Sequence, residues 1–125
     1  MTSGSQLDIR VKRIYEDPDP ADGTRILVDR LWPRGVSKEE ARLDRWLKEI
    51  APSHELRKDF GHDPERWDEF VEAYAEELDR MPTRVAELRD LARRGTVTLL
   101  YSARDTRHNQ AVGLADYLNR EPRDG

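Results

Sequence analysis

The 125-residue chain contains no cysteine. This absence excludes disulfides, thiolate metal sites and a cysteine nucleophile, and it fits a reducing compartment. No apolar run approaches the roughly 20 residues that a membrane helix needs. The opening "MTSGSQ" has none of the apolar character of a signal peptide. We therefore expect a cytoplasmic protein that has no membrane partner.

Net positive charge and phosphate-binding glycine loops are also absent. The formal net charge is −4, whereas a protein that slides on duplex nucleic acid usually has a basic face. Neither G-x-G-x-x-G nor G-x-x-x-x-G-K-[ST] occurs, so we predict no cofactor of the dinucleotide or P-loop type. His54, His62 and His108 are scattered, with no carboxylate at ligand spacing, so we predict no metal site.

Three segments have the pattern of β-strands. Residues 7–15 alternate apolar and polar side chains, which is typical of a strand with one solvated face. "RILVDRLW" (25–32) contains a continuous apolar run, which predicts a strand that ends at Leu31 and is covered on both faces. "TVTLLYSA" (96–103) is a second run of this kind. Because both are central in character, we predict that these two strands are neighbours in one sheet.

Helix signals occupy the rest of the chain. Ser37 with Glu40 forms a capping-box pattern, Ser53 is a cap for 54–60, and Asp63 with Pro64 begins a helix. A further helix starts at Pro82 and stops at Gly95, and the last one is expected to begin near Thr106. Apolar side chains recur at helical spacing after Pro64, and we predict that they line one inner face: Trp67, Phe70, Val71, Tyr74 and Leu78.

Residues 43–50 fit either a helix or a strand, and we favour a short strand that enters Pro52. The alternation of strands and helices predicts the α/β class. We expect a single compact domain over residues 7–120, with a small mixed or parallel sheet of about four strands and helices packed on it. Residues 1–6 and 121–125 are expected to be loose tails.

Two of the predicted strands end in charged turns, "DRLWPRG" and "YSARDTRHN". Ligands of open α/β sheets gather at the carboxyl ends of strands, where helix N-termini favour anions. If the two strands are parallel neighbours, Arg30, Arg34 and Arg104 converge there, and guanidinium groups bind phosphate or carboxylate. The predicted ligand-binding residues are Arg30, Trp32, Arg34, Tyr101, Arg104, His108 and Asn109.

A structural interpretation of the same residues stays open. Arg30 could form an ion pair with Asp29 or Asp105, and Trp32 could pack a corner.

Whether the protein is an enzyme also stays open. His108 is a candidate acid or base, Asp29 and Asp105 are a candidate carboxylate pair, and Ser102 is a candidate nucleophile with His108 as its base. "YSARD" does not match the G-x-S-x-G elbow, so this last signal is weak.

The segments "ILVDRLWPRGV", "LKEIAPSHELRKDFGHDPERWDEFVEAY" and "TVTLLYSARDTRHNQAVGLADYL" resemble the domain-of-unknown-function 488 (DUF488) family, YeaO-like branch. The resemblance runs from about Ile9 to Leu118 and implies an uncharacterised bacterial, cytoplasmic α/β domain. Other branches place a cysteine near the last motif, so the resemblance carries no thiol chemistry to this chain. The family motifs fall on Asp29, Arg30, Trp32, Pro33, Arg34, Gly35, Pro52, Ser53, Leu56, Arg57, Phe60, His62, Tyr101, Asp105, His108 and Asn109.

Three hypotheses follow from these patterns. The first is a pocket for an anionic small molecule, phosphorylated or carboxylated, or for a nucleotide, with or without catalysis. The second is a nucleic-acid-binding or regulatory module, which needs a basic stripe reaching to Arg10, Lys12 and Arg13. The third is an interaction protein with Trp32 and Trp67 partly exposed to a partner.

Overall fold

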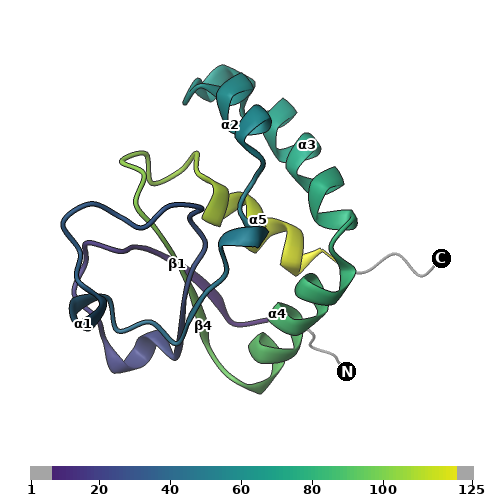
Figure 1. Cartoon of the computed structure of the whole chain (residues 1–125). Helices are drawn as coiled ribbons and strands as arrows, with labels where there is room; N and C mark the ends of the chain where they lie inside the picture. The colour runs from purple at the N-terminus through teal and green to yellow at the C-terminus, as the bar shows by residue number, and fades with distance from the viewer. Residues whose placement is uncertain (1–6, 121–125) are drawn as a thin grey trace.

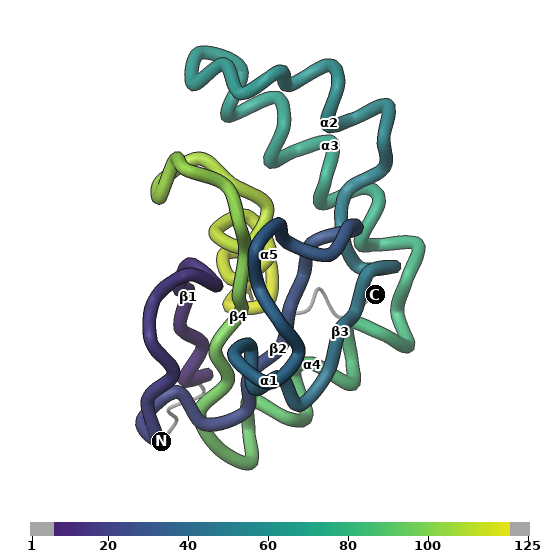
Figure 2. The backbone as a smooth tube through the Cα atoms, turned by 60° about the vertical axis from the view of Figure 1, so that its left-hand side comes forward, coloured from purple at the N-terminus to yellow at the C-terminus, as the bar shows by residue number. Residues whose placement is uncertain are grey.

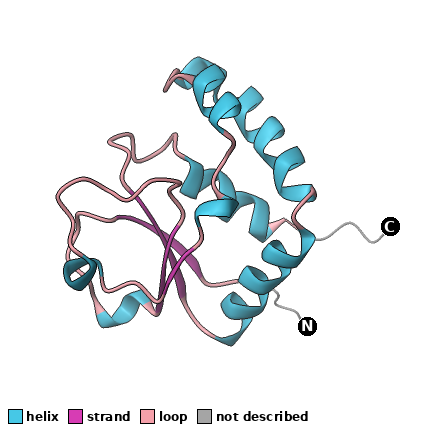
Figure 3. Ribbon diagram, viewed as in Figure 1, coloured by secondary structure: helices cyan, strands magenta, loops and turns pink. Residues whose placement is uncertain are grey.

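A computed structural model describes residues 7–120, and the two predicted tails lie outside these residues. The four strands form one parallel sheet in the order β1-β4-β2-β3 (Figure 2). The paired strands β1 and β4 are labelled in Figure 1. Helices pack around this sheet in a single α/β domain, which confirms the predicted fold class (Figure 3). The strands are β1 (Ile9–Arg13), β2 (Thr24–Leu27), β3 (Arg45–Trp46) and β4 (Val97–Tyr101). The α-helices are α1 (Lys38–Ala41), α2 (His54–Phe60), α3 (Trp67–Asp79), α4 (Pro82–Arg94) and α5 (Gln110–Asn119). Short 3-10 turns occupy η1 (Pro20–Asp22), η2 (Lys48–Ile50) and η3 (Pro64–Arg66).

The two most apolar strands are neighbours, as predicted. β4 lies between β1 and β2, and Ile26 and Leu27 of β2 pair with Leu99 and Leu100 of β4. Every residue of β4 is buried, because helices or loops cover both faces of a central parallel strand. Since the pairing is parallel, the chain leaves β2 and β4 at the same edge of the sheet. None of the helices within residues 7–120 is long and apolar enough to cross a membrane.

The prediction that the second strand ends at Leu31 was wrong, because β2 ends at Leu27. The Val28 N–H still donates to Leu100 O at 3.0 Å. The Ser102 N–H, which a longer parallel ladder would pair with the main chain, instead donates to the Asp29 carboxylate at 3.0 Å. The chain therefore turns away, and Leu31 lies in the following loop with 70% of its surface exposed.

Local capping signals located most helix starts. Ser37 and Glu40 form the predicted capping box, and the Ser53 and Asp63 side chains cap the segments that follow them. The ambiguous residues 43–50 form the short strand β3 followed by η2. The expected helix start near Thr106 was wrong: α5 begins at Gln110, with Asn109 as its cap.

The helices α2 and α3 lie at the edge of the sheet where β4 ends (Figure 2). Two polar contacts hold them there. The Tyr74 hydroxyl of α3 donates to Ile50 O at 2.6 Å, and burial raises the pKa of this phenol far above its ordinary value. Ser53 donates from its N–H and its hydroxyl to the Glu77 carboxylate, at 2.8 and 2.6 Å. These bonds fix α2 against α3 and so place the α2 side chains over the ends of the strands.

The predicted inner face of α3 is confirmed. Phe70, Tyr74 and Leu78 are buried, while Trp67 and Val71 are partly buried against the same core.

We expect Phe70→Ala to lower the free energy of unfolding by roughly 3–5 kcal/mol, because the ring is 4% exposed and lies 4.6 Å from the Phe60 ring. Urea denaturation measures this loss.

Glu72→Ala on the exposed side of α3 is the matched control. It should change the free energy of unfolding by no more than roughly 0.5 kcal/mol. A loss below about 1 kcal/mol for Phe70→Ala would contradict the packing of this face.

Candidate functional site

A cavity of about 710 Å³ opens where β2 and β4 end. Its walls come from segments that are far apart in the sequence. The loop after β2 contributes residues 29–34, and the loop after β4 contributes residues 102–105 and 108–110. Tyr15, Ala51, Pro52, Arg57, Phe60, His62 and Phe70 complete the lining. The cavity therefore occupies the edge at which open α/β sheets bind ligands.

The Asp29 carboxylate joins the two loops below this cavity. One of its oxygens accepts hydrogen bonds from the Ser102 N–H at 3.0 Å and from the Ser102 hydroxyl at 2.6 Å. The other accepts a hydrogen bond from the Gln110 side chain at the start of α5. The Asp29 carbonyl accepts the Trp46 indole N–H at 2.7 Å, which attaches β3. A single buried residue therefore connects the ends of three strands and one helix.

Burial dominates the electrostatics of Asp29. It raises the pKa of this carboxyl above its ordinary value, and the Ser102 hydrogen bonds, the nearby Arg57 and the Gln110 amide offset only part of the rise. Such a carboxyl, partly desolvated beside a cavity and close to cations, is typical of binding and catalytic sites.

The loop after β2 is held in a fixed shape. The Trp32 indole N–H donates to Val36 O at 2.6 Å, and Gly35 adopts a positive φ of 73° that its missing side chain permits. The Tyr15 hydroxyl from the loop after β1 donates to Arg34 O at 3.1 Å. These contacts close the loop on itself and hold the backbone of Arg34 at the rim of the cavity.

Arg30 is fixed by main-chain carbonyls rather than by acids. Its Nη2 donates to Ala51 O at 3.0 Å and to Pro52 O at 3.4 Å. Its Nε is buried and has no hydrogen-bond partner among residues 7–120. Its Nη1 forms no hydrogen bond with these residues either, and it is the accessible N–H₂ group of the guanidinium.

Three more arginines, Arg34, Arg57 and Arg104, line the cavity. Their side chains form no ion pair or hydrogen bond with residues 7–120, and all three are exposed. Within the lining, four arginines face only two carboxylates, Asp29 and Asp105. With neutral histidines, the cavity therefore carries an excess of two positive charges.

Asp105 organises the turn between β4 and α5. Its side chain accepts the N–H groups of Arg107 at 2.8 Å and His108 at 2.9 Å, and these bonds lower the pKa of the carboxyl. The N–H groups that we expected at an open helix N-terminus near Thr106 are thus already bonded. His108 Nδ1 lies 3.0 Å from Asp105 Oδ2, so the Nδ1 position carries the proton and donates it to this carboxylate.

The candidate catalytic residues fall into two separate pairs. The Ser102 hydroxyl bonds to Asp29, while His108 faces Asp105. No hydrogen bond joins Ser102 to His108 among the contacts of residues 7–120, so the structure does not form the candidate pair in which His108 is the base of this serine. Within the same residues, no group of three His, Asp or Glu side chains is arranged to hold a metal ion.

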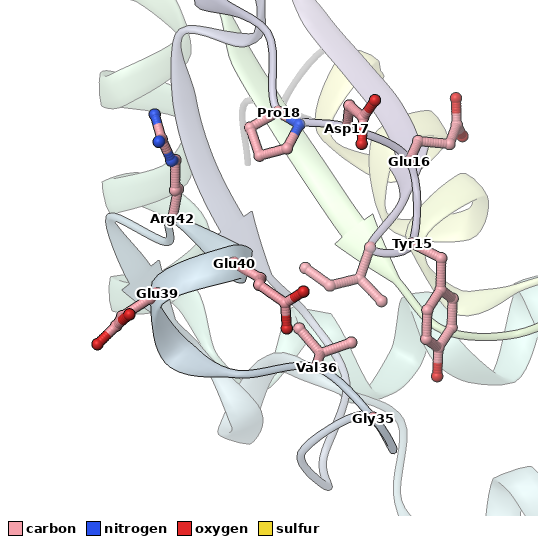
Figure 4. Close-up of a pocket in the computed structure, with 10 residues that line it drawn as sticks. Tyr15, Glu16, Asp17, Pro18, Gly35, Val36, Glu39, Glu40 and Arg42 are labelled. Atoms are coloured by element: carbon pink, nitrogen blue, oxygen red, sulfur yellow. The ribbon is translucent and has the colours of Figure 1, made fainter.

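A second hollow, of about 540 Å³, lies between the loop after β1 and α1. Figure 4 shows Glu40 and Val36 facing Tyr15, with Glu39 pointing away from it. The lining holds Glu16, Asp17, Glu39 and Glu40 but Arg42 as its single cation. The Glu16 carboxylate accepts the Arg13 N–H, and Glu40 belongs to the capping box of α1. The charge of this hollow repels an anion, in contrast to the larger cavity.

A family model described as "Inactive DUF488-N3 subclade" matches residues 8–124. The chain belongs to this subclade of the DUF488 family. It is 48% identical to uncharacterized protein Rv3073c of Mycobacterium tuberculosis (strain ATCC 25618 / H37Rv) over 111 residues, which cover 89% of this chain and 93% of that protein. It is 46% identical to uncharacterized protein YeaO of Escherichia coli (strain K12) over 112 residues, which cover 90% and 97% of the two chains. No solved structure matches the chain.

Most of the motifs by which the chain resembles the DUF488 family meet at the large cavity. Of the predicted ligand-binding residues, Arg30, Trp32, Arg34, Arg104, His108 and Asn109 line it. Tyr101 does not: its side chain is buried in the core. Asn109 is also buried, and its amide caps α5 and bonds to Asp105 O.

Arg57 and Gln110 are two polar residues of the cavity lining that the sequence interpretation did not place there. Arg57 lies four residues after the Ser53 cap, so its place on α2 was predictable, but nothing local showed which way α2 faces. Gln110 follows the last charged turn directly, and its bond to Asp29 depends on a contact between residues 81 positions apart.

Asp29 should make anion binding depend on pH. Because the pKa of Asp29 is raised, we expect the affinity for sulfate to increase as the pH falls towards this pKa and the opposing negative charge is lost. Sulfate is the suitable probe because its own charge is constant over this range. Asp29→Asn should bind sulfate severalfold more tightly than the wild type near neutral pH, as measured by calorimetry.

Wild type and Asp29→Asn share every other residue of the cavity lining, so the comparison between them isolates the aspartate. The Asn and Gln110 amides can pair by turning one of them, which retains the contact. Parallel pH profiles for the two proteins, with equal affinities at neutral pH, would show that Asp29 does not act on the anion.

Proposed function

We propose that the large cavity binds an anionic small molecule, phosphorylated or carboxylated, through Arg30, Arg34 and Arg104, with Arg57 as a fourth cation. The observation that carries this proposal is the unbalanced charge of the lining. Asp29 and Asp105 form no ion pair with any of the four arginines. Like charges gathered in one cavity repel each other, and a bound anion relieves that repulsion.

The geometry favours a rigid binding site. Arg30 is anchored by the carbonyls of Ala51 and Pro52, so its guanidinium loses little freedom when it binds. The Arg34 backbone is held by Tyr15, and the loop that carries Arg104 is held by Arg13, which donates to Ala103 O at 2.9 Å and to Ser102 O at 3.2 Å. Preorganised donors of this kind support tight binding of phosphate or carboxylate groups.

Binding without catalysis is the form of the proposal that fits best. The Ser102 hydroxyl and the His108 ring are each occupied by a different carboxylate. The family description, which calls the subclade inactive, points in the same direction.

The cations that a nucleic-acid interface would need are engaged elsewhere. Lys12 bonds to Asp22 and to Asp17 O, and Arg10 bonds to Asp8 and to Ala21 O. Arg13 holds the loop after β4 and lies over the Tyr15 ring. The basic stripe that the second hypothesis requires is therefore replaced by internal contacts, which supports a confined anion site.

Calorimetry with pyrophosphate tests the proposal. Removing a guanidinium that bonds to a charged group costs roughly 1.5–3 kcal/mol, so Arg34→Ala with Arg104→Ala should weaken binding at least about tenfold per arginine. Both side chains lack partners among residues 7–120, so the fold should be unaffected by their removal.

Arg30→Ala with Arg34→Ala should abolish the binding of pyrophosphate. Near-UV circular dichroism then checks that the fold of this variant is intact.

Arg80→Ala with Arg84→Ala is the matched control, because both arginines are exposed and lie outside the cavity. This variant should bind pyrophosphate like the wild type. Unchanged binding after loss of Arg34 and Arg104, or equal losses in the control, would refute the site. Absence of pyrophosphate, phosphate and carboxylate binding to the wild type would refute it as well.

A further inference from the structure

The cavity has an aromatic wall beside its arginines. Phe60 of α2, His62 of the turn that follows, Phe70 of α3 and His108 all line it. The rings form one continuous cluster. Phe60 lies 4.6 Å from Phe70 and 6.3 Å from His62, and Trp67 lies 5.5 Å from Phe70 and 5.3 Å from His108, centroid to centroid. The loop after β2 adds Trp32, whose ring packs edge-on against Trp46 at 5.3 Å.

His62 occupies its position at a conformational cost. It has a positive φ of 57° and follows Gly61, whose φ is 53°. A histidine adopts this left-handed conformation less readily than glycine does, and residues held in this way occur often at functional sites. Here the conformation places an exposed imidazole in the lining of the cavity, at the end of the aromatic cluster. Packing of the core does not require a ring at an exposed position.

The charge excess and the rings together define a ligand. A phosphate monoester carries about two negative charges at neutral pH, which matches the excess of two cations in the lining. A cavity of about 710 Å³ lies within the range of sites for small organic ligands. Phe60 and Phe70 are almost fully buried, so the rings that this wall presents to the cavity are those of His62, His108 and Trp32. Such rings offer faces on which a planar heterocycle stacks.

Resting on the proposed function, we infer that the anion is a nucleoside monophosphate. Its phosphate binds Arg30 and the exposed arginines Arg34, Arg57 and Arg104. Its base lies against the aromatic wall and contacts the His62 ring. The arginines alone would accept any small anion. The ring cluster adds the selectivity for a ligand that joins a phosphate to a flat heterocycle.

The test compares the four ribonucleoside 5′-monophosphates with ribose 5-phosphate and pyrophosphate, by calorimetry on the full chain. We expect at least one nucleotide to bind about tenfold or more tightly than ribose 5-phosphate, in line with the contribution of one stacked base. His62→Asn removes the ring and keeps a residue that tolerates the left-handed backbone. This variant should lose that tenfold preference and leave the affinity for ribose 5-phosphate unchanged.

His54→Asn is the matched control, because His54 is exposed at the start of α2 and does not line the cavity. It should retain the preference for the nucleotide. Equal affinities for all nucleotides and ribose 5-phosphate, with pyrophosphate still bound, would overturn this inference and leave the anion site in place. Equal effects of His62→Asn and His54→Asn would also overturn it. Failure of every probe to bind would overturn both proposals.

Discussion

The site depends on the hydrogen bonds of one buried carboxylate. Asp29 follows the buried end of β2, and its carboxylate accepts hydrogen bonds from the Ser102 N–H and hydroxyl where β4 ends. It also accepts a hydrogen bond from the Gln110 amide where α5 begins. A buried carboxylate is costly unless donors surround it, so these bonds have to form together. Once they form, the loops after β2 and β4 lie side by side, and the chain of β2 leaves the sheet earlier than its apolar pattern predicts.

The positive charge of the cavity follows from this arrangement. The Asp29 carboxylate accepts hydrogen bonds from Ser102 and Gln110, and the Asp105 carboxylate accepts hydrogen bonds from the turn before α5. The two acids closest to the arginines are therefore engaged with other groups. Contrast the buried Arg25, whose guanidinium bonds to Asp22 at 2.5 Å and to Ala41 O at 2.8 Å. The structural arginine Arg25 therefore has hydrogen-bond partners within the fold. The side chains of Arg34, Arg57 and Arg104 have none among residues 7–120 and can bind a ligand in the cavity.

Sequence patterns predicted what depends on local or repetitive signals. The apolar runs around Ile26 and Leu99 identified the two adjacent central strands, and the side chains of Ser37, Ser53 and Asp63 marked the segments they cap. Because adjacent parallel strands end at one edge, the same patterns indicated that Arg30 and Arg104 lie close together, and both residues line the cavity.

What the sequence did not reveal depends on contacts between distant residues. The start of α5 was misplaced because Asp105 and Asn109 are both capping residues, and the structure uses Asp105 for a turn and Asn109 for the helix. Tyr101 was placed in the site because it precedes a polar turn, but its side chain faces the core. Arg57 reaches the cavity only because Tyr74 and Glu77 fix the α2–α3 pair against η2 and the α2 cap.

The most direct measurement is a crystal structure of the protein grown with pyrophosphate. We predict an anion in the cavity at the ends of β2 and β4, within hydrogen-bonding distance of Arg30 Nη1 and of at least two of Arg34, Arg57 and Arg104. Asp29 should keep its bonds to Ser102 and Gln110. A structure in which Asp29 and Asp105 pair with these guanidinium groups, while the cavity holds no anion, would contradict the account.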